Sequence, residues 1–484
     1  MQVRSIGFVV ALLLCGLTLC AADLPLGHKD FPPTPQHPVG FRGDWTGCYP
    51  GATPPLTWSA TNPVVWKAEV GAGDSPPIVV GDRLFIVTDG VALRCLRAAD
   101  GKLLWFKEHH VSREIPAEAE MWRIEEHVRL LHRLNREKEK RGEVEREIKA
   151  LGLVLDVVNQ SGQRMRTVPA VFKEGPLRDG PISHAVATPC SDGKFVYAWL
   201  PTGVVVCYDM DGNRQWLRIL GEKRVSGGWY GVCVAPSPAL ADGKLVIHYD
   251  QIYCLDAATG KTVWEVAEKR LCTPSPVMGQ KNGTWYVAVS SIKILRLADG
   301  VCIYQEPDSY DGASPIFHDG MFCWVSHAME LPAKPDEKPT LLWQLDGETA
   351  GKLTHFNHVP GPEPGKEYRL RGLGPHNGCS PVCAGGLIYH SFENGLYSAV
   401  DARKGKWVFT QPAGLDRGPG MVVAGEYGFV TANGVIYVFR TGKGVDPSLL
   451  ATNRVPATGG NAPVFSGSSL YLHASNELLC IGGK

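Results

Sequence analysis

The chain has 484 residues, of which 44% are hydrophobic, and its 49 basic residues are balanced by 49 acidic ones. A chain without net charge has no global field to gather nucleic acid or an anionic membrane surface, so neither is expected as a partner. The length fits either two or three ordinary domains or one large array of repeats, and internal repeats decide between these alternatives.

Residues 1–22 have the pattern of a signal peptide. Arg4 precedes an apolar run from Ile6 to Leu19, and cleavage is expected after Ala22. A lipid anchor at Cys20 is the alternative, but Leu19 stands where such signals carry a small residue. No later apolar run reaches the roughly 18 to 20 residues that cross a bilayer. We therefore expect an exported protein, periplasmic or secreted, without a transmembrane span.

An internal repeat covers most of the remaining chain. Its clearest copies are residues 75–108 and 236–268, each with four short apolar stretches separated by turn residues such as Gly-Asp, Ala-Asp-Gly-Lys and Ala-Thr-Gly-Lys. Further copies begin near Ala187, Thr273, Ala313, Cys379, Gly418 and Ala462. Four strands per unit and a period of roughly 40 residues predict an all-β fold, an eight-bladed β-propeller of four-stranded antiparallel blades.

The two ends of the repeat array are complementary. The eighth copy stops at Ile481 without a fourth strand, whereas residues 63–70 read as a single strand before the first full copy. We expect this N-terminal strand to close the last blade, which removes exposed sheet edges. The predicted organisation is an N-terminal extended segment at 23–62 and a propeller at 63–484.

A large aromatic residue recurs four residues after the glycine of the last turn in most copies. On an outer strand such a ring can cover the joint between neighbouring blades. We expect this structural blade-docking role for Trp66, Trp105, Trp216, Trp264, Tyr304 and Phe409.

The pattern Ala-x-x-Gly-Lys-x-x-Trp resembles the pyrroloquinoline quinone (PQQ) repeat. Residues 41–71 also resemble the N-terminal segment of secreted bacterial PQQ-like propeller proteins, which are related to the outer-membrane assembly lipoprotein BamB. The resemblance implies the propeller fold and leaves the activity open, because the repeat is scaffold.

One segment, residues 110–183, interrupts the array between the first and second blades. Met121, Ile124, Val128, Leu131 and Leu134 recur every three or four residues within a charged sequence, which predicts a helical insertion. The helix is expected to pack on the propeller, with a lid over the channel or a docking element for a partner as alternatives.

Three cysteines hold one position of the repeat. Cys95, Cys207 and Cys254 lie shortly before a turn, where other copies carry Ile294 and Ala399. A position shared by Cys, Ile and Ala is a small apolar packing site, so buried free thiols are expected there. No cysteine or histidine spacing typical of a metal site occurs, and none is predicted.

Residues that lead into the innermost strand of each blade should lie at the rim of the central channel, where propellers bind ligands. This set mixes aromatic, amide, cationic and acidic groups, as a polar small molecule or a sugar requires, although such groups also serve simply to solvate a rim. It comprises Asp74, Ser75, His184, Trp229, Tyr230, Asp311, His376, Asn377, Arg417 and Asn461.

Two functions remain open. The favoured one is a non-catalytic binding or scaffolding module, a monomer that engages a protein, peptide or polysaccharide. The alternative is a PQQ- or quinone-dependent oxidoreductase acting on an alcohol or a sugar. PQQ with calcium is the cofactor that the resemblance suggests, but quinoprotein dehydrogenases commonly carry a disulfide between adjacent cysteines, and this chain has no adjacent pair. No catalytic residue is assigned.

Overall fold

The computed structural model of the chain describes residues 25–109 and 187–482 apart from loop gaps, of which the longest are 221–235, 345–358, 369–379, 413–419 and 455–461. Between these two parts it describes only Gly142, Glu143, Arg146, β7 (Val157–Val158) and β8 (Arg164–Met165). The predicted helical insertion therefore lies almost wholly outside the described residues.

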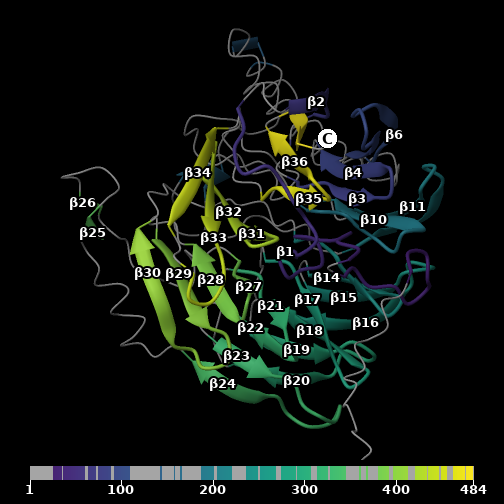
Figure 1. Ribbon diagram of the computed structural model, residues 1–484. Coiled ribbons are helices and arrows are strands. Elements are labelled where there is room, and N and C mark those ends of the chain that lie inside the picture. Colours follow the sequence, from purple (N-terminus) through teal and green to yellow (C-terminus); the bar gives the residue numbers. More distant parts are fainter. Residues whose placement is uncertain are drawn as a thin grey trace, which may run out of the picture.

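Eight four-stranded antiparallel sheets surround a central axis, as predicted (Figure 1). From the innermost strand outward, blade 1 is β3 (Ile78–Val80), β4 (Arg83–Thr88), β5 (Ala92–Arg97) and β6 (Leu103–Glu108). Blade 2 is β9 (Cys190–Ser191), β10 (Phe195–Leu200), β11 (Val204–Asp209) and β12 (Arg214–Ile219). Blade 3 is β13 (Ala239–Ala241), β14 (Lys244–His248), β15 (Gln251–Asp256) and β16 (Thr262–Ala267), and blade 4 is β17 (Val277–Lys281), β18 (Thr284–Val289), β19 (Lys293–Arg296) and β20 (Cys302–Gln305).

The second half of the ring repeats this order. Blade 5 is β21 (Ile316–His318), β22 (Met321–Cys323), β23 (His327–Glu330) and β24 (Thr340–Gln344), and blade 6 is β27 (Val382–Ala384), β28 (Leu387–Ser391), β29 (Leu396–Asp401) and β30 (Trp407–Pro412). Blade 7 is β31 (Gly420–Ala424), β32 (Tyr427–Ala432), β33 (Val435–Arg440) and β34 (Leu449–Arg454). A two-stranded ribbon of β25 (Val359–Pro360) and β26 (Glu367–Tyr368) precedes blade 6.

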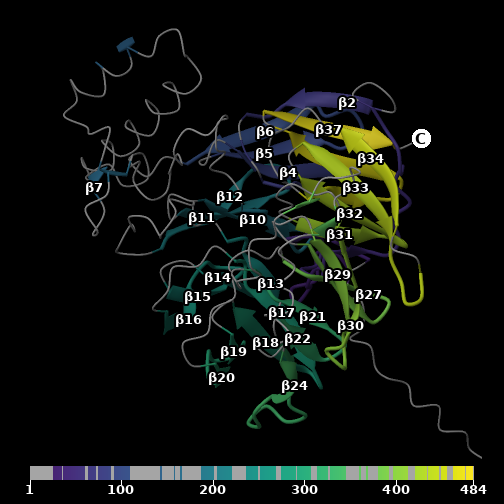
Figure 2. The same cartoon turned by 90° about the vertical axis from the view of Figure 1, so that its left-hand side faces the viewer.

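Blade 8 combines both ends of the chain. β35 (Val464–Ser466), β36 (Ser469–Ala474) and β37 (Glu477–Gly482) are completed by β2 (Val64–Glu69), which pairs antiparallel with β37. In Figure 2 the purple strand β2 lies beside the yellow β37. The predicted closure of the last blade by an N-terminal strand is confirmed.

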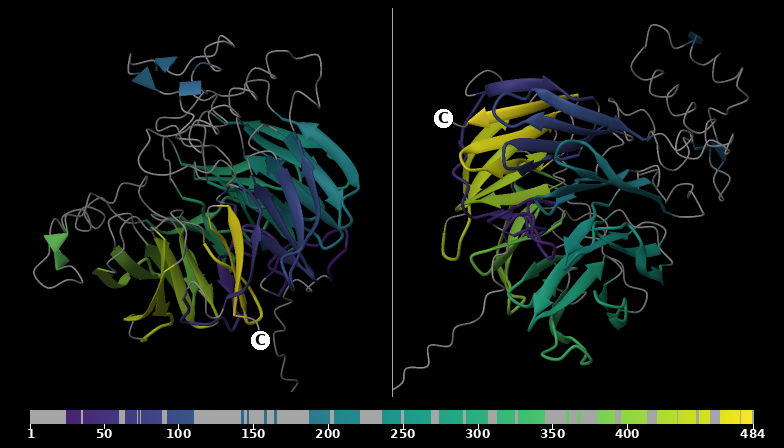
Figure 3. Two further views of the ribbon diagram at one scale, coloured as in Figure 1. Left: turned by 90° about the horizontal axis from the view of Figure 1, so that it is seen from above. Right: turned by 90° about the vertical axis from the view of Figure 1, so that its right-hand side faces the viewer.

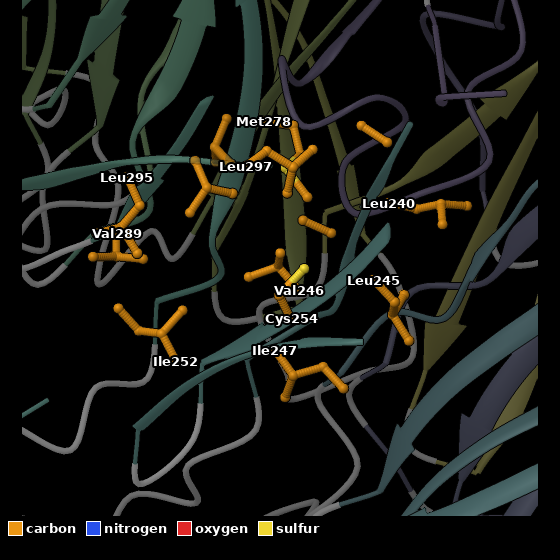
Figure 4. Packing of buried hydrophobic residues seen from close by; sticks show 14 of the residues in the cluster. Leu240, Leu245, Val246, Ile247, Ile252, Cys254, Met278, Val289, Leu295 and Leu297 are labelled. Atoms are coloured by element: carbon orange, nitrogen blue, oxygen red, sulfur yellow. The ribbon is translucent and has the colours of Figure 1, made fainter. Parts of the chain in front are cut away.

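Each strand is a short apolar stretch that ends at a turn, and most of these turns contain a glycine with a positive φ angle. In blades 3 and 4, side chains of the middle strands fill the space between neighbouring sheets (Figure 4), and the buried cluster continues into blades 2 and 5. Cys254 lies in this packing, and Cys95 and Cys207 occupy the same register position in blades 1 and 2. All three are buried free thiols, as the repeat predicts.

The joints between blades share one contact. Five tryptophans on outermost strands donate the indole N–H to a main-chain carbonyl of the next blade: Trp66 to Ala98 (3.0 Å), Trp105 to Met210 (2.9 Å), Trp216 to Ala257 (2.9 Å), Trp264 to Leu297 (2.8 Å) and Trp343 to Ala402 (2.8 Å). Tyr304 and Phe409 hold the same register position in blades 4 and 6, and Ala451 holds it in blade 7.

A second contact joins the innermost strands. The residue just before each of these strands is usually a serine, whose hydroxyl accepts the N–H of the equivalent residue of the preceding blade. We call this set the serine relay: Thr188 to Ser237 (2.9 Å), Ser237 to Ser275 (2.8 Å), Ser275 to Ser314 (2.8 Å) and Ser314 to Ser380 (3.0 Å). The relay runs from blade 2 to blade 6 and stops where Gly420 and Ala462 hold the serine position in blades 7 and 8.

Candidate functional site

The channel has two mouths, which we name by what borders them. The hairpin mouth is bordered by the turns between the first and second strands of the blades, and the loop mouth by the segments that lead into the first strands. The innermost strands of the blades surround the centre of Figure 1, and Figure 3 shows the same ring of blades from two other sides.

Residues 25–58 follow the hairpin mouth and enter the channel. Gly27 N–H donates to Asp192 O at 2.6 Å in the first turn of blade 2, and Val39 O accepts Ser191 N–H at 3.0 Å inside it. On the far side, Thr53 N–H donates to Gly467 O at 2.9 Å in the first turn of blade 8. The segment therefore crosses the channel from blade 2 to blade 8.

Inside the channel this segment adds a fifth strand to blade 7. β1 (Cys48–Tyr49) pairs parallel with β31 and lies beside it near the centre of Figure 1. Gly47 O accepts Val423 N–H at 2.8 Å, and Tyr49 O accepts Gly425 N–H at 3.0 Å. The Tyr49 ring is buried and makes an edge contact with Phe465, with the ring centroids 5.3 Å apart.

Arg42 connects the segment to blades 6 and 7. Its guanidinium is buried and donates to Pro381 O at 2.8 Å and to Met421 O at 2.5 Å. Pro381 directly precedes β27 of blade 6 and Met421 lies on β31 of blade 7, the two innermost strands where the serine relay ends. Arg42 thus provides a connection between blades that the repeat itself lacks there.

Asp44 is a carboxyl group inside the same turn. It is only 9% exposed, and it accepts hydrogen bonds from the main-chain N–H of Thr46, at 3.2 Å, and from the Thr46 hydroxyl. Burial raises the pKa of Asp44 to about 6, although the Thr46 hydrogen bonds and the Arg42 charge act in the opposite direction. The next residue, Trp45, is 3% exposed and packs in the core cluster of blades 2 to 5.

A second cluster of titratable groups lies between blades 3 and 4, near the loop mouth. Lys293 Nζ and Glu268 Oε2 are 2.9 Å apart, with both side chains at most 6% exposed. His248, on β14, is fully buried within the influence of both charges. Burial lowers its pKa to about 4; Glu268 opposes this shift and Lys293 adds to it. His248 is therefore neutral at physiological pH.

Of the ten predicted channel-rim residues, the structure describes only Ser75. Its side chain is buried, and its hydroxyl donates to Ala187 O of blade 2 at 2.7 Å, which is a contact between blades. The other nine lie outside the described residues: Asp74, His184, Trp229, Tyr230, Asp311, His376, Asn377, Arg417 and Asn461.

The described residues of the channel do not fit PQQ and calcium. PQQ carries carboxylates that need free cationic donors, whereas the Arg42 guanidinium donates to Pro381 and Met421. Asp44 is buried in a turn in which its Oδ1 already accepts the Thr46 N–H and hydroxyl, so it does not offer the open oxygen ligands that calcium requires. Within the described part of the chain, no group of three or more His, Cys, Asp or Glu side chains could hold a metal ion.

The sequence places Arg42, Asp44 and Trp45 in a short run, Phe-Arg-Gly-Asp-Trp-Thr-Gly, that interrupts the otherwise proline-rich N-terminal segment. Arg42 and Trp45 adopt positive φ angles of 51° and 68°, which are uncommon for residues other than glycine. The density of glycine and aromatic residues in this run is the one signal in the sequence that marks it as a packed element.

The architecture defines a closed eight-bladed β-propeller. Residues 155–306 match the family model of the outer membrane protein assembly factor BamB, and no curated protein matches the chain. Among solved structures, the quinohemoprotein alcohol dehydrogenase from Comamonas testosteroni is 12% identical with a TM-score of 0.51, covering 93% of this chain and 81% of that one.

Two further structures are similar. The quinohemoprotein alcohol dehydrogenase ADHIIG from Pseudomonas putida HK5 is 12% identical with a TM-score of 0.52, covering 92% of this chain and 80% of that one. BamB from Moraxella catarrhalis is 10% identical with a TM-score of 0.48, covering 86% and 98%. At these identities the likeness shows the fold alone. The family match over residues 155–306 and the blade architecture together support a PQQ-like β-propeller.

Proposed function

We propose that this protein is a non-catalytic binding or scaffolding propeller that acts outside the cytoplasm and engages a protein, peptide or polysaccharide. The observation that carries the proposal is the occupation of the channel by residues 39–49. Arg42, Trp45 and Tyr49 of this segment are buried against blades on different sides of the channel.

Because the protein's own chain fills the channel, binding of a partner on the outer surface is favoured over catalysis on a small molecule in the channel. Propellers that act on small molecules bind them in the channel, where groups from several blades converge. Here the groups that blades 2, 6, 7 and 8 direct toward the hairpin mouth bind the N-terminal segment. The surface around the loop mouth, with the rim residues and the insertion at 110–183, is the proposed contact region for the partner.

The remaining features of the proposal come from the sequence. Residues 1–22 act as a signal peptide that directs export to the periplasm or beyond, and the mature chain is a monomer. Within the described part of the chain, no helix is long and apolar enough to span a membrane. The match of residues 155–306 to the family of the outer membrane protein assembly factor BamB supports a binding role over an enzymatic one.

Calorimetric titration of the mature protein with PQQ and calcium tests the proposal against the oxidoreductase alternative. We expect no saturable binding and no turnover of alcohols or sugars with an artificial electron acceptor. One-to-one binding of PQQ together with reproducible turnover would refute the scaffold function.

The partner is sought by affinity capture from an extract of the source cells, with two variants of the bait. In the first, residues 113–180 are replaced by a short Gly-Ser linker. In the matched control, the exposed loop at 333–338, between β23 and β24, is shortened instead. The proposal predicts a specific partner that the control retains and the insertion variant loses; equal capture by both variants would place the contact elsewhere.

A further inference from the structure

We propose that the hairpin mouth of the channel is a peptide-binding site, which residues 38–53 of the chain occupy in cis as a separable ligand. The proposed ligand class is a peptide with a tight turn followed by a short strand, which carries an arginine, an acidic residue two positions later and aromatic residues at positions three and seven after the arginine. This site lies at the other mouth from the proposed partner surface and does not depend on it.

Main-chain hydrogen bonds supply the first part of the recognition. β1 adds to the inner edge of β31 in parallel, through Gly47 O with Val423 N–H and Tyr49 O with Gly425 N–H. Addition of a short strand to a sheet edge is a common mode of peptide binding, in which backbone bonds give affinity and side-chain pockets give specificity.

Side chains supply the second part. The Arg42 guanidinium donates to two carbonyl oxygens on different blades, an arrangement that a planar group with several fixed donors satisfies and an ammonium does not. Trp45 packs into the core cluster of blades 2 to 5, and Tyr49 into that of blades 7, 8 and 1. Buried aromatic and arginine anchors of this kind are typical of residues that dominate binding energy.

The ring of blades closes without this segment. The closing strand β2 begins at Val64, beyond residues 59–63, and its pairing with β37 does not involve β1. The serine relay and the tryptophan contacts join the blades from blade 8 through blade 1 to blade 6. Blades 6 and 7 are joined by the stacked rings of Tyr397 and Phe439, and blades 7 and 8 by the rings of Phe429 and Phe465. Residues on either side of 38–53 add contacts of the same kind, since the Trp58 main-chain N–H donates to Asn453 Oδ1 at 2.8 Å and Gly27 N–H to Asp192 O at 2.6 Å. The segment thus contacts the ring as a ligand contacts a receptor, with the covalent link running through 59–63.

Fragment exchange on the full chain tests the inference. A site for a specific protease is placed at residues 60–62, the protein is cleaved after folding, and a labelled synthetic peptide of residues 36–58 is added. Exchange is followed by fluorescence anisotropy and size exclusion. We expect the cleaved protein to stay folded, to retain its own segment, and to exchange it for the labelled peptide with saturable one-to-one binding.

Peptide variants then locate the recognition. Arg42→Ala and Arg42→Lys should each weaken binding by at least ten-fold, because lysine cannot bridge both carbonyls, and Tyr49→Ala should weaken it similarly. Thr57→Ala is the matched control, since Thr57 is exposed, and it should bind like the unaltered peptide.

Three results would overturn the inference. These are unfolding of the ring on cleavage, a segment that never exchanges, and equal binding of the arginine variants and the control. A separate measurement needs no cleavage: in the intact chain, Arg42→Ala should raise amide hydrogen exchange of β31 at least ten-fold over Thr57→Ala. Unchanged exchange there would also contradict the assigned role of Arg42.

Discussion

The indole N–H of Trp66 donates to the carbonyl oxygen of Ala98 at 3.0 Å, and this bond crosses the point where the ring closes. Trp66 lies on β2, the last strand of blade 8, whereas Ala98 follows β5 in blade 1. The bond therefore joins two blades that are consecutive in space but lie at the two ends of the repeat array.

Replacing Trp66 by phenylalanine should separate the hydrogen bond from the burial of the ring. Trp66→Phe keeps an aromatic side chain and loses the N–H, so the free energy of unfolding should fall by about 1 kcal/mol, plus the loss from a smaller ring. Trp66→Ala also removes the ring and should cost about 3–5 kcal/mol, measured by urea unfolding.

Trp264→Phe is the matched control, because Trp264 makes the same bond to Leu297 inside the array. The two Phe variants should lose similar free energy. If the Trp66 variants unfolded like the wild type while Trp264→Phe did not, the closing contact would not contribute to stability.

Gly101 shows how tightly this closing contact is packed. Its φ is 71°, and a Cβ atom at this position would lie 2.6 Å from Cε3 of Trp66. Gly101→Ala combines backbone strain with this clash, so it should lower the free energy of unfolding by about 2–4 kcal/mol.

Gly81→Ala isolates the backbone part of that loss. Gly81 has a similar φ of 60°, but a Cβ there meets nothing within 4 Å. We expect Gly81→Ala to cost about 1 kcal/mol. A Gly101 variant no less stable than the Gly81 variant, by urea unfolding, would show that Trp66 moves aside freely.

The repeat made most of the fold predictable from the sequence. Short strands separated by glycine turns specify each blade locally. The single strand predicted at 63–70 completes the last copy, which has only three strands. Counting strands therefore predicts that the ring closes at the strand that carries Trp66. Trp343 escaped the prediction because the turn before it is a proline- and lysine-rich loop at 332–339 instead of Ala-x-Gly-Lys. The outer strand of blade 5 therefore lacks the local signal.

The channel contents were not predictable in the same way. Arg42 contacts Pro381 and Met421, more than 330 residues away, and nothing periodic in residues 25–58 encodes those partners. The relation between Lys293 and Glu268 is equally tertiary, since the two lie on different blades. The local sequence pattern predicts which residues face the joint between two blades, but it does not predict which charged side chains pair across that joint.

Asp44 should make stability depend on pH. Its pKa in the folded protein is about 6 against 3.8 in the unfolded chain, so the folded state binds its proton more tightly. The contribution to stability is fully present below pH 4, falls as the pH rises from about 4 to 6, and is lost above that range. At 1.36 kcal/mol per pKa unit it amounts to at most about 3 kcal/mol.

Asp44→Asn removes this dependence and keeps an oxygen that can accept the Thr46 hydrogen bonds. Relative to the wild type, the Asn variant should gain stability between pH 4 and pH 7, as measured by urea unfolding at several pH values. Using the difference between the two proteins cancels the titration of all other groups. Parallel pH profiles for wild type and variant would mean that Asp44 ionises as freely as in water.

For the buried ion pair of Lys293 and Glu268, removing one charge should destabilise the protein more than removing both charges. Lys293→Met removes the positive charge beside the buried Glu268 carboxylate, and the free energy of unfolding should fall by about 3–5 kcal/mol. Adding Glu268→Gln removes the stranded charge, so the double variant should be more stable than Lys293→Met alone.

Lys244→Met is the control for this pair, because Lys244 Nζ and Asp242 are 2.9 Å apart but more exposed, with Asp242 at 45%. A pair in contact with solvent is worth about 1 kcal/mol or less, so this variant should unfold nearly like the wild type. Equal losses for Lys293→Met and Lys244→Met would indicate that water reaches Glu268. The joint between blades 3 and 4 would then be hydrated at its end near the loop mouth, and His248 would titrate closer to its ordinary pKa of 6.5.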